Sequence, residues 1–467
     1  MLLAGLAAVW LVLACAPALA HATLVEASPR PGGEMSKPPE RIELHFSEPV
    51  DAEFDPVIVR AADGARVDAH HARVDPEDAR VVLADLEKLP EGSYTVKWRV
   101  TSIDGHVVEG RYTFAVVAAE EDRPSEDAGE RDTSAEAAGV HSGHHDGHHG
   151  GGAGNVASTD RRESVPEPAA GRAASSQAAS IEHGLALAAA AFLAGLAPFA
   201  TIVWLPASRH SGVGRDAIRS FGVLAGGLLL ALAVAGVGDL SSYAVRASGD
   251  TLSSELLWRT LFDSRVGALW LARLSVALLA AAAIAAGARS RRTWVWWAAI
   301  GASGMLIMTL TGLSHAAATC RLLPLLADWT HAAAAAVWMG GLLGFGVALC
   351  SGPYRSLAPD SQTKLRERAV RRFSAVATCA VVVLAGSGLY AALLHVPNPQ
   401  ALLATPYGRA LIAKLALLAL LLTVGASNLL LRGRGPLGRL VVIELLLALG
   451  LFVATGFLTS LPPASGA

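Results

Sequence analysis

Hydrophobic and polar positions follow different patterns in the two halves of the chain. Between residues 21 and 118, apolar residues alternate with polar ones in short runs, which is typical of strands with one buried face. Turn sequences such as Asp63-Gly64 and Pro90-Glu91-Gly92 separate the runs. The clearest runs are residues 41–47, 56–60, 80–84, 94–101 and 107–117. We predict about seven short strands in this region, packed as an antiparallel sandwich.

From residue 183 to residue 461, this alternation gives way to long apolar runs with short charged breaks. Each run has about 20 residues, the length that an α-helix needs to cross roughly 30 Å of hydrocarbon. The runs are residues 185–206, 218–239, 265–287, 294–314, 327–350, 373–395, 409–431 and 440–460. The pattern predicts an all-α polytopic membrane domain of eight transmembrane helices.

Two segments fit neither pattern. Residues 1–20 are apolar and end in Ala18-Leu19-Ala20, which predicts a secretory signal peptide, although a positively charged start is missing. Cleavage after this sequence makes His21 the first residue of the mature chain, and lipidation of Cys15 is the alternative. Residues 119–182 are acidic and then rich in Gly, Ser and Ala, which predicts a disordered linker.

The linker contains the sequence HSGHHDGHH. Its histidines are His141, His144, His145, His148 and His149. A tract of this composition binds metal ions without geometric selectivity. The alternative is a solvated spacer whose histidines have no role.

Basic residues predict the orientation of the membrane domain. Export of the first domain makes the first transmembrane helix run inward, so alternate loops are cytoplasmic. The cytoplasmic loops then hold Arg209, Arg215, Arg219, Arg289, Arg291, Arg292, Arg355, Lys364, Arg366, Arg368, Arg371, Arg372, Arg432, Arg434 and Arg439. The opposite loops hold only Arg246, Arg259, Arg265, Arg321 and Arg409. This asymmetry supports the helix count and places the N-terminal domain in the periplasm.

Composition excludes some classes of protein. The net charge of -2 over 467 residues provides no basic field, so nucleic acid is not an expected partner. The four cysteines, Cys15, Cys320, Cys350 and Cys379, are scattered and form no disulfide framework. The chain has no phosphate-binding loop of the ATPase type, so ATP-driven transport is not expected.

The N-terminal domain carries a candidate metal site. A free N-terminal His21 offers its amine and its ring to one metal ion, and Asp104 and His106 are two residues apart near a predicted strand end. Alternation along a strand would place both side chains on one face, with Gly105 between them allowing a close backbone approach. These nitrogen and oxygen ligands suit tetragonal Cu(II), whereas zinc would favour a tetrahedral set. The alternative is that Asp104-Gly105 is only a turn and His106 a surface residue.

Two stretches of this domain resemble a known family. HATLVEASPRPGGEMSKPPERIELHFSEPV and SIDGHVVEGRYTFAV are similar to the periplasmic copper-binding CopC family over residues 21–117. The resemblance implies an immunoglobulin-like, cupredoxin-like β-sandwich and implies that His21, Asp104 and His106 bind Cu(II). Some family members bind Cu(I) through a Met-rich loop, but Met35 is the only methionine between residues 21 and 117. We therefore expect a head that binds only Cu(II).

The membrane half contains four histidines that the predicted topology puts at the outer ends of helices. They are His183, His315, His331 and His395. Imidazoles gathered at one membrane face predict a metal or proton site, and His315 and His331 are the favoured pair. Met308 lies two helical turns before His315, on the same helix face, where a thioether suits Cu(I). For each residue, helix capping or packing is the alternative.

Four polar residues lie deeper within the predicted helices. They are Arg273, Lys414, Asn428 and Glu444. Such groups pair with one another or line a cavity, because exposing them to lipid is costly. Asn428 and Glu444 lie at similar depth and are expected to be hydrogen-bonded. A structural polar network and a role in conduction both remain open.

The membrane half also resembles a known family. WTHAAAAAVWMGG, RFSAVATCAVVVLAGSGLY and TPYGRALIAKLALLALLLTVGASNLLL are similar to sequences of the CopD family of inner-membrane copper proteins, over about residues 183–461. The whole chain is thus similar to natural CopC–CopD fusions. The resemblance implies a non-enzymatic protein of the bacterial inner membrane that binds copper in the periplasm and imports it, contributing to copper homeostasis and resistance.

The expected partners are copper ions, the lipid bilayer and periplasmic copper chaperones, and the membrane site would hold Cu(I) or Cu(II). Two other classes of function stay open. An N-terminal histidine with a second histidine also resembles the copper site of oxidative enzymes, and histidine pairs in membrane helices bind haem, so a membrane-bound copper or haem redox protein is one alternative. The other is a copper sensor without transport, in which the helices only anchor the head.

Overall fold

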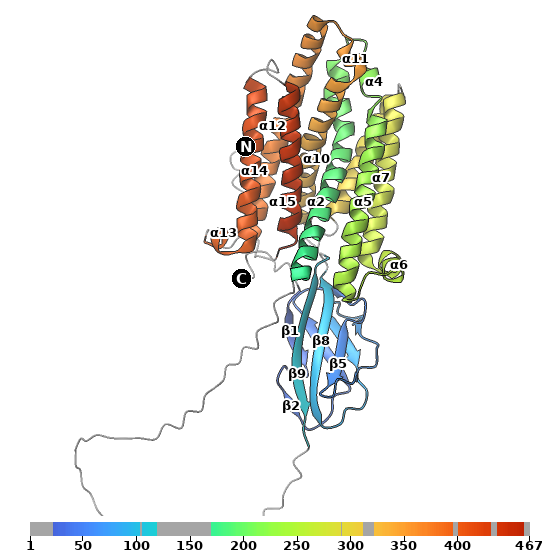
Figure 1. Ribbon diagram of the computed structural model, residues 1–467, viewed down its shortest axis with the longest axis vertical. Coiled ribbons are helices and arrows are strands. Elements are labelled where there is room, and N and C mark those ends of the chain that lie inside the picture. Colours follow the sequence, from blue (N-terminus) through green and yellow to red (C-terminus); the bar gives the residue numbers. More distant parts are fainter. Residues whose placement is uncertain are drawn as a thin grey trace, which may run out of the picture.

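The computed structural model describes residues 22–102, 105–118, 170–290, 292–311, 322–395, 400–430 and 437–461. Two bodies follow each other along the long axis: a β-sheet domain, here the head (residues 22–118), and a bundle of helices (residues 170–461) (Figure 1). The ends of the head's longest strands point at one end of the bundle. We call this end the head-facing end.

The head is a sandwich of two sheets. Its strands are β1 Leu24–Ser28, β2 Glu34–Met35, β3 Arg41–Phe46, β4 Val50–Asp51, β5 Val57–Ala61, β6 Arg73–Val74, β7 Val81–Asp85, β8 Gly92–Ser102 and β9 Val107–Val116. One sheet has the order β1-β3-β7-β6, and the other has the order β2-β9-β8-β4, with β5 also pairing with β8. The predicted β-sandwich fold is confirmed, and the five predicted runs correspond to β3, β5, β7, β8 and β9.

Alternating burial explains why these strands pack face to face. In β8, the side chains of Tyr94, Val96, Trp98 and Val100 are buried while their neighbours are more exposed, so every second residue faces the other sheet. The stacked rings of Tyr94 and Phe114, with centroids 5.3 Å apart, join β8 to β9 in the same core.

The sequence pattern predicted an antiparallel sandwich, but one pair of strands is parallel. Strand β2 pairs with β9 in parallel, because the turn before it is bound to β9. The Gly32 N–H donates to the Thr113 carbonyl oxygen (2.7 Å), and the Ala115 N–H donates to the Gly33 carbonyl oxygen (2.9 Å). Strand β1 and the two-residue strands β2, β4 and β6 were absent from the five clear runs, since their burial does not alternate regularly.

The bundle consists of long helices joined by short ones. They are α2 Ala170–Pro198, η1 Phe199–Trp204, α3 Leu205–Ala207, α4 Gly214–Ala217, α5 Phe221–Ser248, α6 Ser254–Asp263, α7 Arg265–Arg289, α8 Thr293–Thr311, α10 Leu322–Cys350, α11 Gly352–Arg355, α12 Pro359–His395, α13 Ala401–Ala404, α14 Pro406–Leu430 and α15 Leu437–Thr459. Within the described residues, eight helices are long and apolar enough to cross a membrane, which confirms the predicted number.

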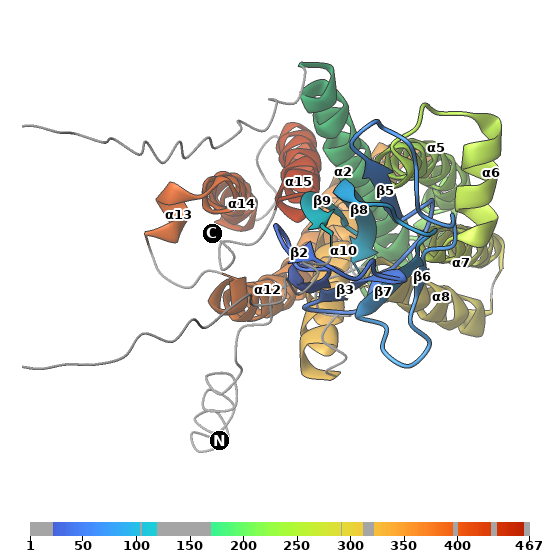
Figure 2. The ribbon, with the colours of Figure 1, turned by 90° about the horizontal axis from the view of Figure 1, so that it is seen from below.

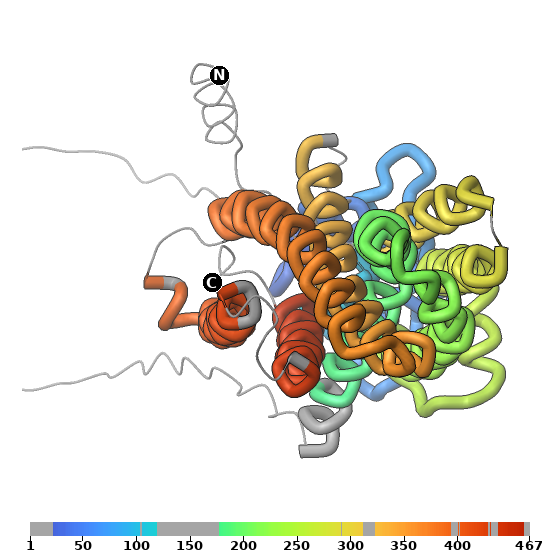
Figure 3. The backbone as a smooth tube through the Cα atoms, turned by 90° about the horizontal axis from the view of Figure 1, so that it is seen from above, coloured from blue at the N-terminus to red at the C-terminus, as the bar shows by residue number. Residues whose placement is uncertain are grey.

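Helix α2 forms the centre of the bundle. It packs against α5, α8, α10 and α15, and most of its apolar residues are buried, whereas few residues of α14 are. Small residues permit this central position, because a Cβ atom on Gly195 would collide with the backbone of Ala336 in α10. Helix α14 lies at the edge of the bundle, and α12 runs from that side across the end of the bundle away from the head, as the views along the axis show (Figures 2 and 3).

Helix α6 was not predicted from the sequence. It begins after Ser253, whose Oγ accepts a hydrogen bond from the Leu256 N–H (3.1 Å), and it lies across the head-facing ends of α5 and α7 (Figure 2). Its Trp258 and Phe262 rings are exposed and contact each other with centroids 4.4 Å apart. Ten residues are too short to span a membrane, which is why the hydropathy pattern did not reveal this helix.

Candidate metal centre at the domain interface

The head contacts the bundle through two polar side chains, Glu53 just after β4 and Thr101 near the end of β8. The Tyr243 hydroxyl of α5 donates a hydrogen bond to Glu53 Oε2 (3.2 Å) and lies 3.1 Å from Thr101 Oγ1. The Arg265 N–H at the start of α7 donates to Glu53 Oε1 (3.2 Å). We call these three hydrogen bonds the docking contact. It places the end of β8 directly against the head-facing ends of α5 and α7.

Charged groups surround the docking contact. Arg265 Nη1 lies 3.8 Å from Asp51 Oδ2, and the Arg259 guanidinium of α6 lies over the Phe54 ring, 5.6 Å from its centroid. Burial raises the pKa of the Glu53 carboxyl, and the nearby Asp51 charge raises it further against the opposing effects of the Arg265 N–H and Tyr243. Burial also raises the pKa of Asp51, and the opposing effect of Arg265 is smaller, so the pKa of Asp51 lies above its ordinary value. The interface therefore holds two carboxyl groups whose charged forms are disfavoured.

His106 lies between the head and the bundle. Its Nε2 is 2.7 Å from the carbonyl oxygen of Thr459, the last residue of α15. A carbonyl oxygen only accepts hydrogen bonds, so in the neutral ring Nε2 carries the proton and Nδ1 keeps the lone pair. Nδ1 is buried. An imidazole whose other nitrogen donates to a carbonyl is the usual arrangement of a metal-binding histidine.

The other two predicted ligands of the head, His21 and Asp104, lie outside the described residues. The chain next to them is described. The Ala22 N–H donates to Ser102 Oγ (2.9 Å), and the Ser102 N–H donates to the His106 carbonyl oxygen (2.8 Å). The residues that flank the predicted ligands therefore meet at the end of β8, beside the bundle.

The argument from strand alternation is wrong for this site. Strand β8 ends at Ser102 and β9 begins at Val107, so His106 belongs to the connection between the strands. Gly105 has a φ of 86°, a left-handed conformation that favours glycine, and its N–H donates to the Ser102 carbonyl oxygen (2.8 Å). A turn thus determines where His106 lies, as in the alternative interpretation, but His106 contacts the bundle and is not a free surface residue.

His183 of α2 lies at the head-facing end of the bundle, as predicted. Its Nδ1 is 3.1 Å from Asp239 Oδ2 of α5, and the two side chains are 32% and 25% exposed. The neighbouring Glu182 accepts a hydrogen bond from Ser242 Oγ (3.2 Å). Asp239 was missed in the sequence analysis. A lone carboxylate at the end of the apolar run 218–239 was the signal that could have revealed it.

His331 lies deeper than predicted, because α10 begins at Leu322, before the expected start at residue 327. Nine residues of helix correspond to about 13 Å along the axis. Its Nδ1 is 2.8 Å from Ser387 Oγ of α12, and this hydroxyl donates to the Val383 carbonyl oxygen (2.6 Å). The oxygen of Ser387 therefore accepts the Nδ1 proton, and the Nε2 lone pair of His331 is left for a metal ion.

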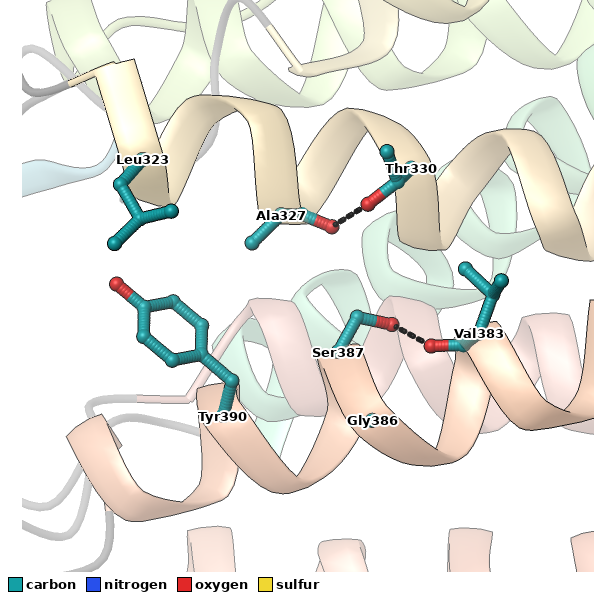
Figure 4. Close-up of a pocket in the computed structure, with 7 residues that line it drawn as sticks. All are labelled: Leu323, Ala327, Thr330, Val383, Gly386, Ser387 and Tyr390. Carbon is teal, nitrogen blue, oxygen red and sulfur yellow. Dashed lines mark hydrogen bonds between the residues drawn. The ribbon is translucent and has the colours of Figure 1, made fainter. Parts of the chain in front are cut away.

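A cavity of about 270 Å³ opens beside His331, between α10 and α12 (Figure 4). Leu323 and Thr330 line it from α10, and Ser387 and Tyr390 line it from α12. Figure 4 shows the Tyr390 hydroxyl pointing across the cavity toward Leu323, and the Ser387 hydroxyl bonded within its own helix. The hydroxyl that holds His331 thus also lines this cavity.

The remaining predicted histidines cannot be joined to this group by described contacts. His315 and the linker residues His141, His144, His145, His148 and His149 lie outside the described residues. His395 is the last residue of α12, and its side chain is outside them as well. No described hydrogen bond joins His183 to His331. In the described part of the chain, no three His, Cys, Asp or Glu residues lie close enough together to hold a metal ion.

The deep polar residues have partners of different kinds. Arg273 is 5% exposed, donates from Nη2 to the Thr309 carbonyl oxygen of α8 (3.1 Å) and interacts electrostatically with Asp239. Lys414 of α14 interacts electrostatically with His331 and Asp328. These residues thus lie within polar surroundings inside the bundle.

Two further predictions concern the pair Asn428 and Glu444, in α14 and α15, and Met308 in α8. Glu444 is 5% exposed, and a Cβ atom on Gly425 of α14 would lie 3.9 Å from its Oε1. Asn428 is one helical turn beyond Gly425, but its side chain is outside the described residues, so the hydrogen bond predicted between them stays a prediction. Met308 is 48% exposed, and its sulfur is 4.0 Å from Thr311 Oγ1.

Comparisons with known proteins divide the chain into three regions. Residues 24–117 match the family model of the CopC domain. Residues 178–323 match that of the copper resistance protein D-like N-terminal domain, and residues 367–458 match copper resistance protein D.

Individual proteins are similar to the whole chain or to the head alone. The copper transport protein CutJ of Bacillus subtilis (strain 168) is 26% identical over 457 residues, which cover 95% of this chain and 74% of that protein. Copper resistance protein C of Pseudomonas syringae pv. tomato is 33% identical over 113 residues, 22% of this chain and 87% of that protein. The crystal structure of CopC from Methylosinus trichosporium OB3b has 34% identity and a TM-score of 0.21, covering 22% of this chain and 98% of that one.

Proposed function

Because this chain belongs to the family in which a CopC domain is fused to a copper resistance protein D domain, we propose that it captures copper in the periplasm and imports it across the inner membrane of a bacterium. Domains of this family take part in copper resistance and copper transport. The helical half is a multi-pass membrane domain with eight candidate spans. Copper is its cargo, and the protein acts without catalysing a chemical reaction.

The head captures Cu(II) in the periplasm. The mature N-terminal amine and ring of His21, the carboxylate of Asp104 and the imidazole of His106 form the ligand set, which suits tetragonal Cu(II). The observation that carries this proposal is the contact between His106 and the carbonyl oxygen of Thr459 (2.7 Å), because it links a predicted ligand of the head directly to the bundle. The linker ends where α2 begins at Ala170, before the predicted end at residue 182, and its histidines buffer copper near the head.

The bundle moves copper inward through histidines. His331, whose Nδ1 is held by Ser387, provides a ring nitrogen for copper beside the cavity between α10 and α12. His315 contributes the second imidazole, with Met308, His183 and His395 as further ligands along the way. Without a phosphate-binding loop, transport follows the copper gradient or is coupled to an ion gradient.

The proposed orientation puts the head in the periplasm and the opposite end of the bundle in the cytoplasm. Helices α4 and α11 lie at the end away from the head (Figure 1), and they carry Arg215 and Arg355. Basic residues at that end agree with the excess of positive charge in cytoplasmic loops. Periplasmic copper chaperones would deliver copper to the head.

Two measurements on the full mature chain test this function. Electron paramagnetic resonance of the Cu(II)-loaded protein should show a tetragonal nitrogen and oxygen site, which is lost when one alanine is added before His21. Proteoliposomes that contain the protein should accumulate copper, and those that contain the His331→Ala variant should not. Copper binding without any uptake would favour a sensor, and a haem absorption band in the purified protein would favour a redox protein.

A further inference from the structure

We propose that His183, held by Asp239, is the first side chain of the bundle to receive copper from the head, and that it does so before His331. This inference rests on the proposed function and gives the transfer a starting point. Three observations carry it: a continuous path of contacts from His106, a ring held in the tautomer that binds metal, and a balance of charge around the ring.

The path of contacts runs from the head to α2 through the end of α15. His106 Nε2 lies 2.7 Å from the Thr459 carbonyl oxygen, and the next residue, Ser460, lies 2.8 Å from Ser180 of α2 between the two hydroxyl oxygens. His183 follows Ser180 by three residues, so both side chains lie on the same face of α2, with Cβ atoms about 5–6 Å apart. The contacts thus lead from His106, through the end of α15, to the face of α2 that carries His183.

The backbones of α2 and α15 are in direct contact at this point, which keeps the path short. A Cβ atom on Gly184 would lie 2.7 Å from the Val453 Cα atom, and one on Gly456 would collide with the Ser180 carbonyl oxygen. Only glycine fits at either position without a shift of one helix. The distance between the end of α15 and His183 is therefore fixed by packing.

Asp239 prepares the His183 ring to bind metal. An ionised carboxylate only accepts hydrogen bonds, so the Nδ1 atom 3.1 Å away carries the proton and Nε2 keeps its lone pair. A carboxylate behind a histidine also increases the basicity of the nitrogen that binds metal. Because His183 is 32% exposed, an incoming ion can reach the ring.

The transfer requires only an exchange of ligands. The bonds from copper to the amine and ring of His21, to the Asp104 carboxylate and to the His106 imidazole break in turn. A bond from copper to His183 Nε2 forms and water molecules complete the coordination, with no change in the oxidation state of copper. No proton has to leave His183, because Nε2 is already unprotonated in this tautomer. The head and the bundle stay in contact throughout.

The charges around His183 are balanced, so copper is held there by coordination alone. Arg246 and Arg273 interact electrostatically with Asp239, and Glu182 lies against Gly238, next to Asp239 in the chain. Two carboxyl groups, Glu182 and Asp239, and the two guanidinium groups that act on Asp239 therefore lie in this part of the bundle. A site of this kind lets copper move on, as transfer requires, whereas an uncompensated group of carboxylates would retain it.

Copper uptake by proteoliposomes tests the inference. The His183→Asn variant keeps a hydrogen-bond donor for Asp239 but lacks the metal-binding nitrogen, and His210→Ala, at the other end of the first span, is the matched control. We expect uptake of Cu(II) added outside to fall at least tenfold in His183→Asn and to be unchanged in His210→Ala. Uptake by the Asp239→Asn variant should fall about tenfold, the lower limit of the effect for partners of metal-binding histidines. Uptake by Asp239→Glu should be faster than by Asp239→Asn.

Paramagnetic resonance of the same samples separates this inference from the proposed function. Copper bound to the head should give the same spectrum in all four variants. If the head binds copper and His183→Asn takes it up at the wild-type rate, copper does not pass through His183, although the proposed function stands. If wild-type protein takes up no copper, both the proposed function and this inference are wrong.

Discussion

Two histidines of the bundle, His183 and His331, are oriented by the same kind of hydrogen bond in different surroundings. In each, Nδ1 is bonded to an acceptor on a neighbouring helix, which leaves the lone pair on Nε2. The acceptor of His183 is the carboxylate of Asp239, at the end of the bundle that contacts the head. The acceptor of His331 is the hydroxyl of Ser387, deeper in the bundle and beside a cavity.

The difference between the two sites predicts the order in which they act. At His183 the negative charge of Asp239 is balanced by Arg246 and Arg273, whereas a copper ion at His331 lies near the positive charge of Lys414. Opposite charge strengthens binding and like charge weakens it. Copper should therefore be captured at His183 and released from His331, and the predictions below test that division.

The largest effect is expected at His331. The His331→Asn variant keeps a donor for Ser387 but loses the metal-binding nitrogen, so we expect uptake to fall by more than about 100-fold, beyond the range for partners of metal-binding histidines. Copper should still leave the head and stay bound to the bundle, because His183 is intact. X-ray absorption of copper-loaded His331→Asn, compared with copper-loaded His183→Asn, shows where copper is bound in each variant. The order is refuted if copper stays on the head in both variants.

The two acceptors should differ in their effect on transport. Asp239→Asn removes a charged hydrogen bond, worth about 1.5–3 kcal/mol, and Ser387→Ala removes a neutral one, worth about 1 kcal/mol. Uptake should therefore fall about tenfold or more in the first variant and about fivefold in the second.

Ser241→Ala is the matched control for Ser387→Ala, because the Ser241 hydroxyl also donates within its own helix, to the Val237 carbonyl oxygen (2.7 Å), and contacts no histidine in the described structure. Its uptake should equal that of the wild type. A larger loss in Ser387→Ala than in Asp239→Asn would reverse the proposed difference between the sites.

The sequence predicted where helices and strands lie better than which side chains meet. The apolar runs and the alternation in residues 94–101 depend on local composition, so eight spans and the main strands could be read directly. Helix α6 was missed, since an amphipathic helix of ten residues has no strong hydropathy signal. Strand β2 was missed, because its parallel pairing depends on contacts with the distant β9.

The candidate sites show the same limit. His183 and His331 were identified as histidines at the outer ends of predicted helices, but their acceptors, Asp239 and Ser387, are each 56 residues away and meet them only through helix packing. The contact between His106 and Thr459 spans 353 residues and could not be inferred from spacing. The ligand roles of His21 and Asp104 stay predictions, because these residues lie outside the described structure.

Loosening the docking contact should affect His183 and leave His331 unchanged. The Tyr243→Phe variant loses the hydroxyl that joins Glu53 and Thr101, a loss of about 1 kcal/mol or roughly a fivefold shift away from the docked state. If the head remains mostly docked after this fivefold shift, copper uptake should fall less than fivefold. Tyr354→Phe, at the opposite end of the bundle, is the control. Hydrogen exchange should increase in residues 50–57 and stay unchanged around Ser387.

The smallest effect is a dependence of docking on pH. Burial raises the pKa of Glu53 and of Asp51 above their ordinary values of 4.5 and 3.8. A carboxyl group whose pKa is raised in the docked state binds its proton more tightly there, so protonation favours docking. This stabilisation is complete below the ordinary pKa values and disappears as the pH rises through the raised ones. Lowering the pH from 7 to 5 should therefore increase the docked fraction.

Distance measurements between spin labels on the head and the bundle, in a background without native cysteines, would detect this shift. Glu53→Gln removes the larger part of the pH dependence, because the amide cannot titrate. Its oxygen still accepts from the Arg265 N–H, and its NH2 group replaces Oε2 and donates to the Tyr243 hydroxyl oxygen. Neither His331 nor Ser387 takes part in the docking contact, so the step at His331 should show no matching change between pH 7 and pH 5. The docked fraction could instead fall on acidification. The loss of the ion pair between Asp51 and Arg265 would then outweigh the lower cost of burying two neutral carboxyl groups, and acid would release the head from the bundle.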